Sequence, residues 1–386
     1  MAGTGLSERP DVESASWLTK AYYSMGLFVV GGLDLGTPTG GPWWARTLLW
    51  IAYFGAPLLT ASAVLEAVLR MLRPGRWQLR NMGNHTIIFG AGRLTISYLR
   101  VLLKVSPTER IVVVNREFDP VTEQELKQKF GALTIVGDLT HDYLLSMLRL
   151  KKAKRVLLLG DNDFQAFEAA SRILTIAPRL KNRIILHCHN LRFMRSLADT
   201  ELAEQCQIFN VYNLAARGFM HDNLLTHFAD TTPKDVVVIA GFGRFGQSVL
   251  EELQAHASDE VLQVAVVDID ADRRVLVVAE QEQVAADGFE RTVFQGDISH
   301  PEVWRRLTDT VDLTDDRPTV ILGTGREQEN LRTALWIKQK YPNAQVFART
   351  NDISQFVQDV GQEHGVKNIS ITQLVEDHLP HSWLQN

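Results

Sequence analysis

The chain has 386 residues, 45% of them hydrophobic and 22% charged, with 26 Gly and 13 Pro. This composition excludes a disordered or low-complexity chain, and the length predicts two or three domains. Lys and Arg number 40 against 45 Asp and Glu, a net charge of −5, so the basic excess of a nucleic-acid-binding protein is missing. The two cysteines, Cys188 and Cys206, are too few for a disulfide scaffold and indicate a reducing compartment.

The N-terminal part begins with a polar stretch, and we expect a disordered leader over residues 1–16. The next 15 residues are mostly apolar but too short to cross a bilayer, which predicts an interfacial or re-entrant segment. Residues 31–42 contain five Gly and two Pro, so their backbone cannot be helical and needs cover from protein or water at membrane depth. We therefore predict a re-entrant segment and loop over residues 17–42, with an ordinary extracellular loop as the alternative for its second half.

Residues 47–65 carry no charged side chain, and this length gives about 28 Å of α-helix. They predict one transmembrane helix over residues 43–73, for which a buried helix of a soluble domain is the alternative. Tryptophans precede this stretch, and four arginines lie between residues 70 and 80. Because basic flanks remain in the cytoplasm, we expect the N-terminus to face outward and the chain beyond the linker at residues 74–84 to be cytoplasmic.

From residue 85 onward, short β-branched runs alternate with amphipathic segments, beginning with HTIIFG, IVVVN and LTIVGD. Such runs are typical of strands buried on both faces, which predicts a parallel, doubly wound α/β sheet. The same order of runs recurs with DVVVIAG, LQVAVVD and TVFQGD. This internal duplication predicts two tandem Rossmann-like domains, over residues 85–232 and 233–386.

The second copy contains a complete glycine-rich turn between a strand and a helix. Gly241 permits the tight turn, Gly243 lets the backbone approach a pyrophosphate, and Gly246 lets the helix pack on the sheet. Asp268 ends the next strand, where a carboxylate accepts hydrogen bonds from a ribose diol. The alternative is that the glycines only form the turn and bind nothing. The candidate nucleotide-binding residues of this domain are Gly241, Gly243, Arg244, Gly246, Asp268 and Asp297.

The first copy departs from this pattern at two places. Thr95 stands where the packing glycine belongs, and Asn115 and Arg116 replace the carboxylate. An amide still bonds a ribose and an arginine pairs with a phosphate, so this site binds another nucleotide or none. Its candidate residues are Gly90, Gly92, Arg93, Asn115, Arg116 and Asp138. Asp138 and Asp297 each follow a glycine after the third strand, where they line the crevice or cap the next helix.

We predict no catalytic residue and no metal site. His187 and His189 share one face of a strand, but no third ligand lies near them in sequence. The Tyr-x-x-x-Lys pair of short-chain dehydrogenases and the Gly-Lys-Ser/Thr phosphate loop are both absent from the sequence. The nucleotide is therefore expected to be read rather than transformed.

The tandem pattern of a strand, a Gly-x-Gly-Arg turn, VVVN or VVD, a Gly-Asp pair, VLLLGDND and RIILHCHN resembles the regulator-of-potassium-conductance domain. This RCK domain is also called TrkA-N, and the resemblance covers about residues 84–375. Two such domains after a membrane segment resemble bacterial ligand-gated potassium channels and their plant relatives of the Castor and Pollux type. The resemblance implies four subunits around one pore, gated by a ring of RCK domains that bind NAD(H), other nucleotides or cations.

Upstream, residues 21–38 resemble a pore helix with its filter loop, and residues 44–72 resemble the inner helix behind it. The Thr-Val-Gly-Tyr-Gly run of potassium filters is absent, and a glycine-rich run stands in its place. The filter-like residues that the resemblance implies are Val30, Gly31, Gly32, Asp34 and Gly36.

Together these features predict a nucleotide-sensing RCK-type subunit of a potassium or other cation channel, and not an enzyme. NAD(H) or another adenine nucleotide is the expected regulatory ligand. We expect a homo-oligomer, a tetramer by resemblance, in the inner (plasma) membrane with cytoplasmic RCK domains and no nucleic-acid partner. The alternatives are a non-conducting regulatory subunit of a potassium transporter and a membrane-tethered NAD(P)-dependent oxidoreductase.

Overall fold

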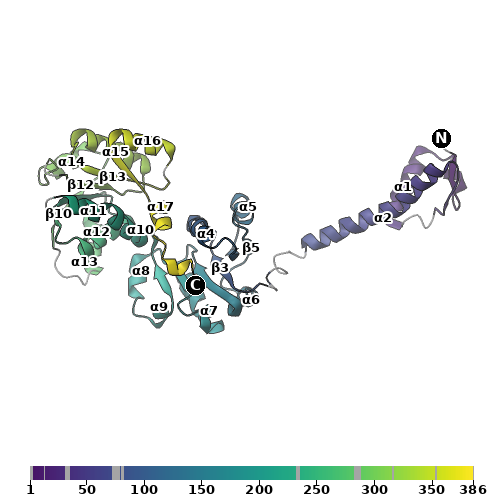
Figure 1. Cartoon of the computed structure of the whole chain (residues 1–386), viewed down its shortest axis with the longest axis horizontal. Coiled ribbons are helices and arrows are strands. Elements are labelled where there is room, and N and C mark those ends of the chain that lie inside the picture. The colour runs from purple at the N-terminus through teal and green to yellow at the C-terminus, as the bar shows by residue number, and fades with distance from the viewer. Residues whose placement is uncertain are drawn as a thin grey trace. The chain divides into compact units, whose positions relative to one another are not determined.

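The computed structural model describes residues 3–12, 14–30, 35–71, 79, 82–231, 235–281, 288–314, 317–352 and 354–385. The chain divides into two compact units, Met1–Asn81 and Met82–Asn386. Figure 1 shows the helices of the first unit and the two sheets of the second.

The described residues of the first unit form two short strands and three helical segments, and the first strand begins at Thr4. Its elements are β1 (Thr4–Leu6), η1 (Pro10–Val12), α1 (Trp17–Val30), β2 (Pro38–Gly40) and α2 (Trp43–Met71). The disordered leader that we expected is wrong, because β1 pairs antiparallel with β2. The Ser7 N–H donates to the Thr37 carbonyl over 3.0 Å, and the Thr37 N–H donates to Ser7 Oγ over 2.8 Å. In the described part of the Gly- and Pro-rich loop, β2 is extended, so its backbone groups pair with those of residues 4–6.

Helix α2 is apolar along most of its length. Among the described residues it alone is long and apolar enough to cross a membrane, over Trp43–Glu66 with a mean hydropathy of 1.8. Large apolar side chains such as Ile51, Phe54 and Leu58 are exposed on it. Exposed apolar surface of this extent is typical of a face that meets lipid or a partner protein. Helix α1 packs against α2, and its 14 residues span about 21 Å.

The second unit begins with a six-stranded parallel sheet in the order β5-β4-β3-β6-β7-β8. Its strands are β3 (His85–Phe89), β4 (Arg110–Asn115), β5 (Leu133–Val136), β6 (Ala153–Leu158), β7 (Ile184–His187) and β8 (Gln207–Phe209). Its helical segments are α4 (Arg93–Val105), α5 (Pro120–Gln128), α6 (Asp142–Met147), η2 (Leu150–Lys152), α7 (Asp163–Ile176), η3 (Pro178–Leu180), α8 (Leu191–Ser196) and α9 (Glu201–Gln205).

A second parallel sheet repeats this order as β11-β10-β9-β12-β13-β14. Its strands are β9 (Asp235–Ala240), β10 (Val261–Asp268), β11 (Glu290–Gln295), β12 (Thr319–Leu322), β13 (Gln345–Thr350) and β14 (Val366–Ser370). Its helices are α12 (Arg244–His256), α13 (Ala271–Gln281), α14 (Pro301–Thr308), α15 (Glu327–Lys340) and α16 (Gln355–His364). The predicted pair of doubly wound α/β domains is confirmed.

Five further helical segments lie either between the two sheets in sequence or after the second sheet. They are α10 (Val211–Phe219), the π-helix η4 (Met220–Leu224), α11 (Leu225–Asp230), α17 (Ile371–Asp377) and η5 (His381–Trp383). Helix α10 belongs to the first domain by sequence, but it packs on α12 and α17. Its Phe219 lies 4.9 Å, between ring centroids, from Phe347 of the second sheet. The packing boundary therefore does not coincide with the sequence boundary at residue 232.

The C-terminal segment returns to the first domain, as its yellow end in Figure 1 shows. Tyr98 Oη donates to the Trp383 carbonyl over 2.7 Å, and Trp383 Nε1 donates to Gln207 Oε1 over 2.6 Å. Arg155 also donates to the Trp383 carbonyl, and the indole packs 4.5 Å from the Phe209 ring centroid. These contacts tie the end of the second domain to the sheet of the first.

We expect Trp383→Ala to destabilise the whole chain by about 3–5 kcal/mol, because it removes a side chain that is only 5% exposed. Urea unfolding of the detergent-solubilised protein measures the change. The matched control is Phe356→Ala, at an aromatic residue that is 68% exposed. Equal unfolding midpoints for the two variants would contradict a tying role of the C-terminal segment.

Candidate nucleotide-binding crevices

The glycine-rich turn of the second domain joins β9 to α12 at the carboxyl edge of the sheet. Gly241 has φ +102°, and a Cβ added there would lie 2.6 Å from the Thr324 backbone nitrogen. At Gly246 an added Cβ would overlap the Gly241 carbonyl, so only glycine brings the helix this close to the strand. At Gly243 the nearest atom to an added Cβ is Arg274 Nη1, at 3.7 Å. The turn therefore has the geometry that a phosphate-binding turn requires.

Asp268, which we expected to accept a ribose diol, lies beside this turn but already has protein partners. Its carboxylate accepts hydrogen bonds from the Phe242 N–H at 2.7 Å, the Asp270 N–H at 2.9 Å and Arg274 Nη1 at 2.9 Å. The side chain is only 7% exposed. A carboxylate offers about four lone-pair positions, so one remains for a ribose hydroxyl. The main effect of Asp268 here is to fix the turn and to hold Arg274 over it.

Asp297 forms an ion pair with Arg326, which lines this crevice, with 2.8 Å between Oδ2 and Nη2. The hydrogen bond from Arg326, followed by that from the Ser299 N–H, holds the pKa of Asp297 well below its usual range. The alternative that Asp138 and Asp297 cap the next helices is wrong, because His141 and His300 occupy those N-cap positions. Asp138 lines the first crevice, and Asp297 pairs with Arg326 of the second, so their roles in nucleotide binding stay predictions.

The second crevice encloses a cavity of about 170 Å³ and is rich in positive charge. Arg274, Arg326 and Arg349 line it, against the carboxylates of Asp268 and Asp297. Helix α12 begins here without a side-chain cap on its N-terminal N–H groups. An uncapped helix N-terminus with three guanidinium groups favours a multiply charged anion such as a pyrophosphate. Sequence reasoning missed these three arginines, which come from α13, from the loop after β12 and from β13 itself.

The first domain builds the same turn with a threonine. Gly90 has φ +107°, and an added Cβ would lie 2.8 Å from the Leu159 carbonyl oxygen. Thr95 takes the place of the packing glycine and is fully buried. Its Oγ1 donates to the Gly90 carbonyl over 2.8 Å. The hydroxyl thus makes a hydrogen bond where the second domain makes a bare backbone contact, so the substitution preserves the turn.

Arg116 crosses the first crevice, which encloses a cavity of about 260 Å³. Its Nε lies 2.8 Å from Asp138 Oδ2, and its Nη2 donates to Gln165 Oε1 over 2.7 Å. Hydrogen bonds from the Thr140 backbone, together with Arg116, lower the pKa of Asp138. Asn115 donates from Nδ2 to the Glu117 carbonyl over 2.6 Å. This crevice is the larger of the two. It is also less cationic, because one arginine lines it and it has no counterpart of Arg274.

Three of the predicted site residues line a different cavity. Gly92 and Arg93 at the start of α4, and Arg244 at the start of α12, face a pocket between the two domains. No atom lies within 4 Å of a Cβ added at Gly92. The spacing of a Gly-x-Gly-Arg turn does not indicate that its arginine lines the interdomain pocket. The side chain at the first helical position points away from the crevice that the glycines form.

The filter-like residues lie mostly outside the described part of the chain. Gly31, Gly32 and Asp34 are not among the described residues, and Val30 ends α1. Gly36 has φ +69°, and a Cβ added there would lie 2.7 Å from the Glu8 backbone nitrogen. Gly36 thus permits close packing against the segment after β1, and its role in a filter stays a prediction.

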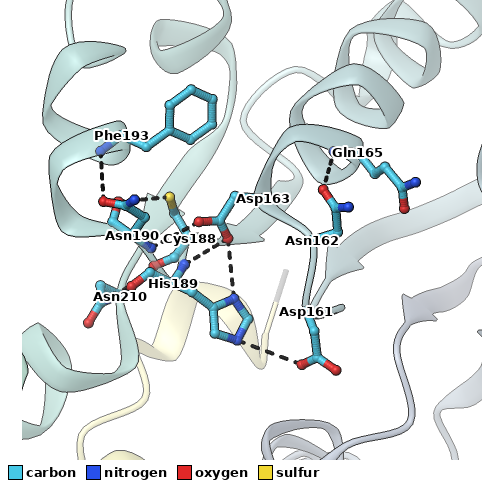
Figure 2. A network of polar contacts seen from close by, with 9 residues as sticks. All are labelled: Asp161, Asn162, Asp163, Gln165, Cys188, His189, Asn190, Phe193 and Asn210. Carbon is cyan, nitrogen blue, oxygen red and sulfur yellow. Dashed lines mark hydrogen bonds and ion pairs between the residues drawn. The ribbon is translucent and has the colours of Figure 1, made fainter.

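A polar network joins the ends of β6 and β7 beside the first crevice (Figure 2). The Asp163 carboxylate accepts from the backbone N–H groups of His189 at 2.8 Å and Asn190 at 2.9 Å, and it lies 3.2 Å from His189 Nδ1. Burial opposes the charge, but these hydrogen bonds prevail and lower the pKa of Asp163. Within the described residues no group of three His, Cys, Asp or Glu side chains could hold a metal ion. Its hydrogen bonds hold the start of α7 against the segment that follows β7.

Comparison with known proteins identifies the class of this fold and site. The TrkA-N domain family matches residues 86–205 and 237–372, well over half of the chain. The chain belongs to the TrkA-N domain family, whose fold is the RCK regulatory domain. A search of the curated proteins found no match.

The solved structures that it resembles include GsuK. The structure of GsuK bound to ADP aligns with a TM-score of 0.52 at 17% identity, over 94% of this chain and 88% of that one. The GsuK channel bound to NAD aligns with a TM-score of 0.55 at 13% identity, over 94% of this chain and 76% of that one. At these identities the likeness establishes the fold.

We expect Gly246→Ala to destabilise the chain by about 1–3 kcal/mol, because its Cβ would force α12 away from the Gly241 carbonyl. Thermal unfolding in detergent measures this loss. The control is Gly325→Ala in the same crevice, where an added Cβ meets nothing within 4 Å. An unchanged melting temperature for Gly246→Ala would show that the helix is not held against the strand.

Proposed function

We propose that the chain is a nucleotide-sensing RCK-type subunit of a potassium or other cation channel. NAD(H) or another adenine nucleotide is its regulatory ligand. The observation that carries this proposal is the second crevice, where an uncapped glycine-rich helix start faces three arginines. The residues that line this crevice are suited to bind and orient an anion. They do not include a nucleophile hydrogen-bonded to a base, as an enzyme would need.

The ligand's phosphates would lie over Gly243, between the start of α12 and the guanidinium groups of Arg274 and Arg326. Its ribose would use the remaining lone pair of Asp268. In the first crevice, Asn115 would contact the ribose and Arg116 the phosphate. The residues present fit an adenine nucleotide in both crevices, with the tighter phosphate contacts in the second.

The membrane part of the proposal rests on α2. Its apolar stretch Trp43–Glu66 spans about 36 Å, enough to cross a bilayer with some tilt. The arginines that follow it support a cytoplasmic position of the RCK domains at the inner (plasma) membrane. One helix cannot enclose a pore, so several copies, four by resemblance to RCK channels, assemble around the path of the cations.

Nucleotide binding changes gating only by the difference in affinity between the closed and open states. The crevices are suited to this because ion pairs such as Arg326–Asp297 must rearrange when a phosphate arrives. Movement of the glycine-rich helices would then pass to α2 through the linker that joins the two units.

The binding prediction uses the full chain in detergent and isothermal titration with ADP and NAD. We expect Arg326→Gln to weaken binding about 10- to 100-fold, because it removes a charge-assisted phosphate contact. Gly243→Val should weaken it further by blocking the backbone approach. The control is Arg305→Gln, at an exposed position on α14. Wild-type protein that binds neither nucleotide at millimolar concentration would contradict the sensing function.

The conduction prediction uses purified protein in liposomes. We expect a cation flux that responds to ADP or NAD and that loses this response in Gly243→Val. A fluorescent potassium indicator inside the vesicles reports the flux. Nucleotide binding without flux under any of these conditions would replace the channel by a non-conducting regulatory subunit of a potassium transporter. Turnover of NAD would instead favour the oxidoreductase.

A further inference from the structure

The pocket between the two domains is separate from both crevices and encloses about 310 Å³. The first turn of α4 forms one wall, and Arg244 of α12 and Arg349 of β13 form the other. Arg93, Arg244 and Arg349 thus bring three positive charges from two domains to one cavity. Arg349 also lines the second crevice, so the two cavities share a residue.

Two of these arginines, Arg244 and Arg349, are held in position by neighbouring groups, and no ion pair to an acidic side chain in the described part of the chain accounts for them. Tyr212 lies between two of them, with its ring centroid 5.1 Å from the Arg244 guanidinium and 5.5 Å from that of Arg349. Arg349 donates to the Gly323 carbonyl over 3.2 Å. Asp161 is the acidic residue that lines the pocket, and its side chain is fully exposed to solvent. Like charges gathered in this way favour a bound anion.

A second observation points to the same cavity. His187 lines the pocket, is only 3% exposed, and neither of its ring nitrogens has a hydrogen-bond partner. Burial, helped by His189, lowers the pKa of His187 to about 3, so its ring is neutral at neutral pH. A neutral imidazole has one donor and one acceptor, and leaving both unpaired in a protein interior is costly. A ligand that carries an anionic oxygen and a hydroxyl group satisfies both.

We propose that this interdomain pocket is a third binding site, which takes the phosphate group of a phosphorylated sugar compound on Arg93, Arg244 and Arg349. The phosphate has two sources. It belongs to the distal half of a dinucleotide whose other half lies in the first crevice, since Asp161 lines both cavities. Otherwise it belongs to a separate phosphorylated molecule. In both cases the ligand bridges α4 and α12 and holds the two domains together.

The test is isothermal titration of the full chain in detergent with NAD, ADP and inorganic phosphate. We expect Arg244→Gln and Arg93→Gln each to weaken binding about 10- to 100-fold. The matched control is Arg192→Gln, an exposed arginine on α8 that does not line the pocket. Weaker binding of NAD alone identifies the distal half of a dinucleotide, and weaker binding of ADP or phosphate identifies a separate ligand.

Unchanged binding of all three ligands in both arginine variants overturns the proposal. If Arg326→Gln still weakens ADP or NAD binding in that case, nucleotide sensing by the second crevice stands without the third site. If phosphate alone binds and needs Arg244, the third site stands and the proposed nucleotide sensing fails.

A second variant separates a binding role of His187 from a structural one. His187→Phe keeps a ring in the cavity and removes the unpaired nitrogens. We expect weaker ligand binding with no fall in the melting temperature of the ligand-free protein. A lower melting temperature with unchanged binding would overturn the role assigned to His187.

Discussion

The close approach of a helix to the first strand of each sheet sets where the N-terminus of that helix faces its crevice. In the second domain this approach depends on Gly246, where a methyl group would overlap the Gly241 carbonyl. In the first domain Thr95 reaches the equivalent Gly90 carbonyl with its hydroxyl. The backbone N–H groups at the start of each helix therefore lie at the carboxyl edge of a parallel sheet, where the strand ends present their charged side chains.

The two crevices share this frame but differ in charge. Asp268 accepts hydrogen bonds from the Phe242 N–H of the turn and from Arg274. With Arg326 and Arg349 also lining it, the second crevice remains cationic. In the first crevice, Arg116 forms an ion pair with Asp138 and donates a hydrogen bond to Gln165. Because α10 and the C-terminal segment each pack on the other domain, the two domains share a packed interface.

Much of the fold followed from the sequence, because buried parallel strands leave continuous β-branched runs and glycine turns leave a fixed spacing. The sixth strands, β8 and β14, were missed, since QIF and VKNIS are short and lie at sheet edges. The ordered leader was missed because pairing of β1 with β2 depends on a contact across some 30 residues.

The candidate site was only partly predictable for a similar reason. The glycines and Asp268 stand at fixed distances from a strand and could be found. Arg274, Arg326 and Arg349 come from a helix, a loop and a strand, and only the folded chain brings them together. Arg93 and Arg244 belong to the predicted motif, but their side chains line the interdomain pocket. The direction of a side chain at the first helical position cannot be read from spacing.

Hydrogen exchange of the full chain in detergent, with and without ADP or NAD, tests most directly whether the glycine turns hold a nucleotide. Phosphate binding at the helix starts predicts slower exchange of the backbone N–H groups of residues 242–247, and of residues 91–96 if the first crevice also binds. Unchanged exchange at both turns, at nucleotide concentrations that raise the melting temperature, would place the ligand elsewhere and contradict this interpretation of the two crevices.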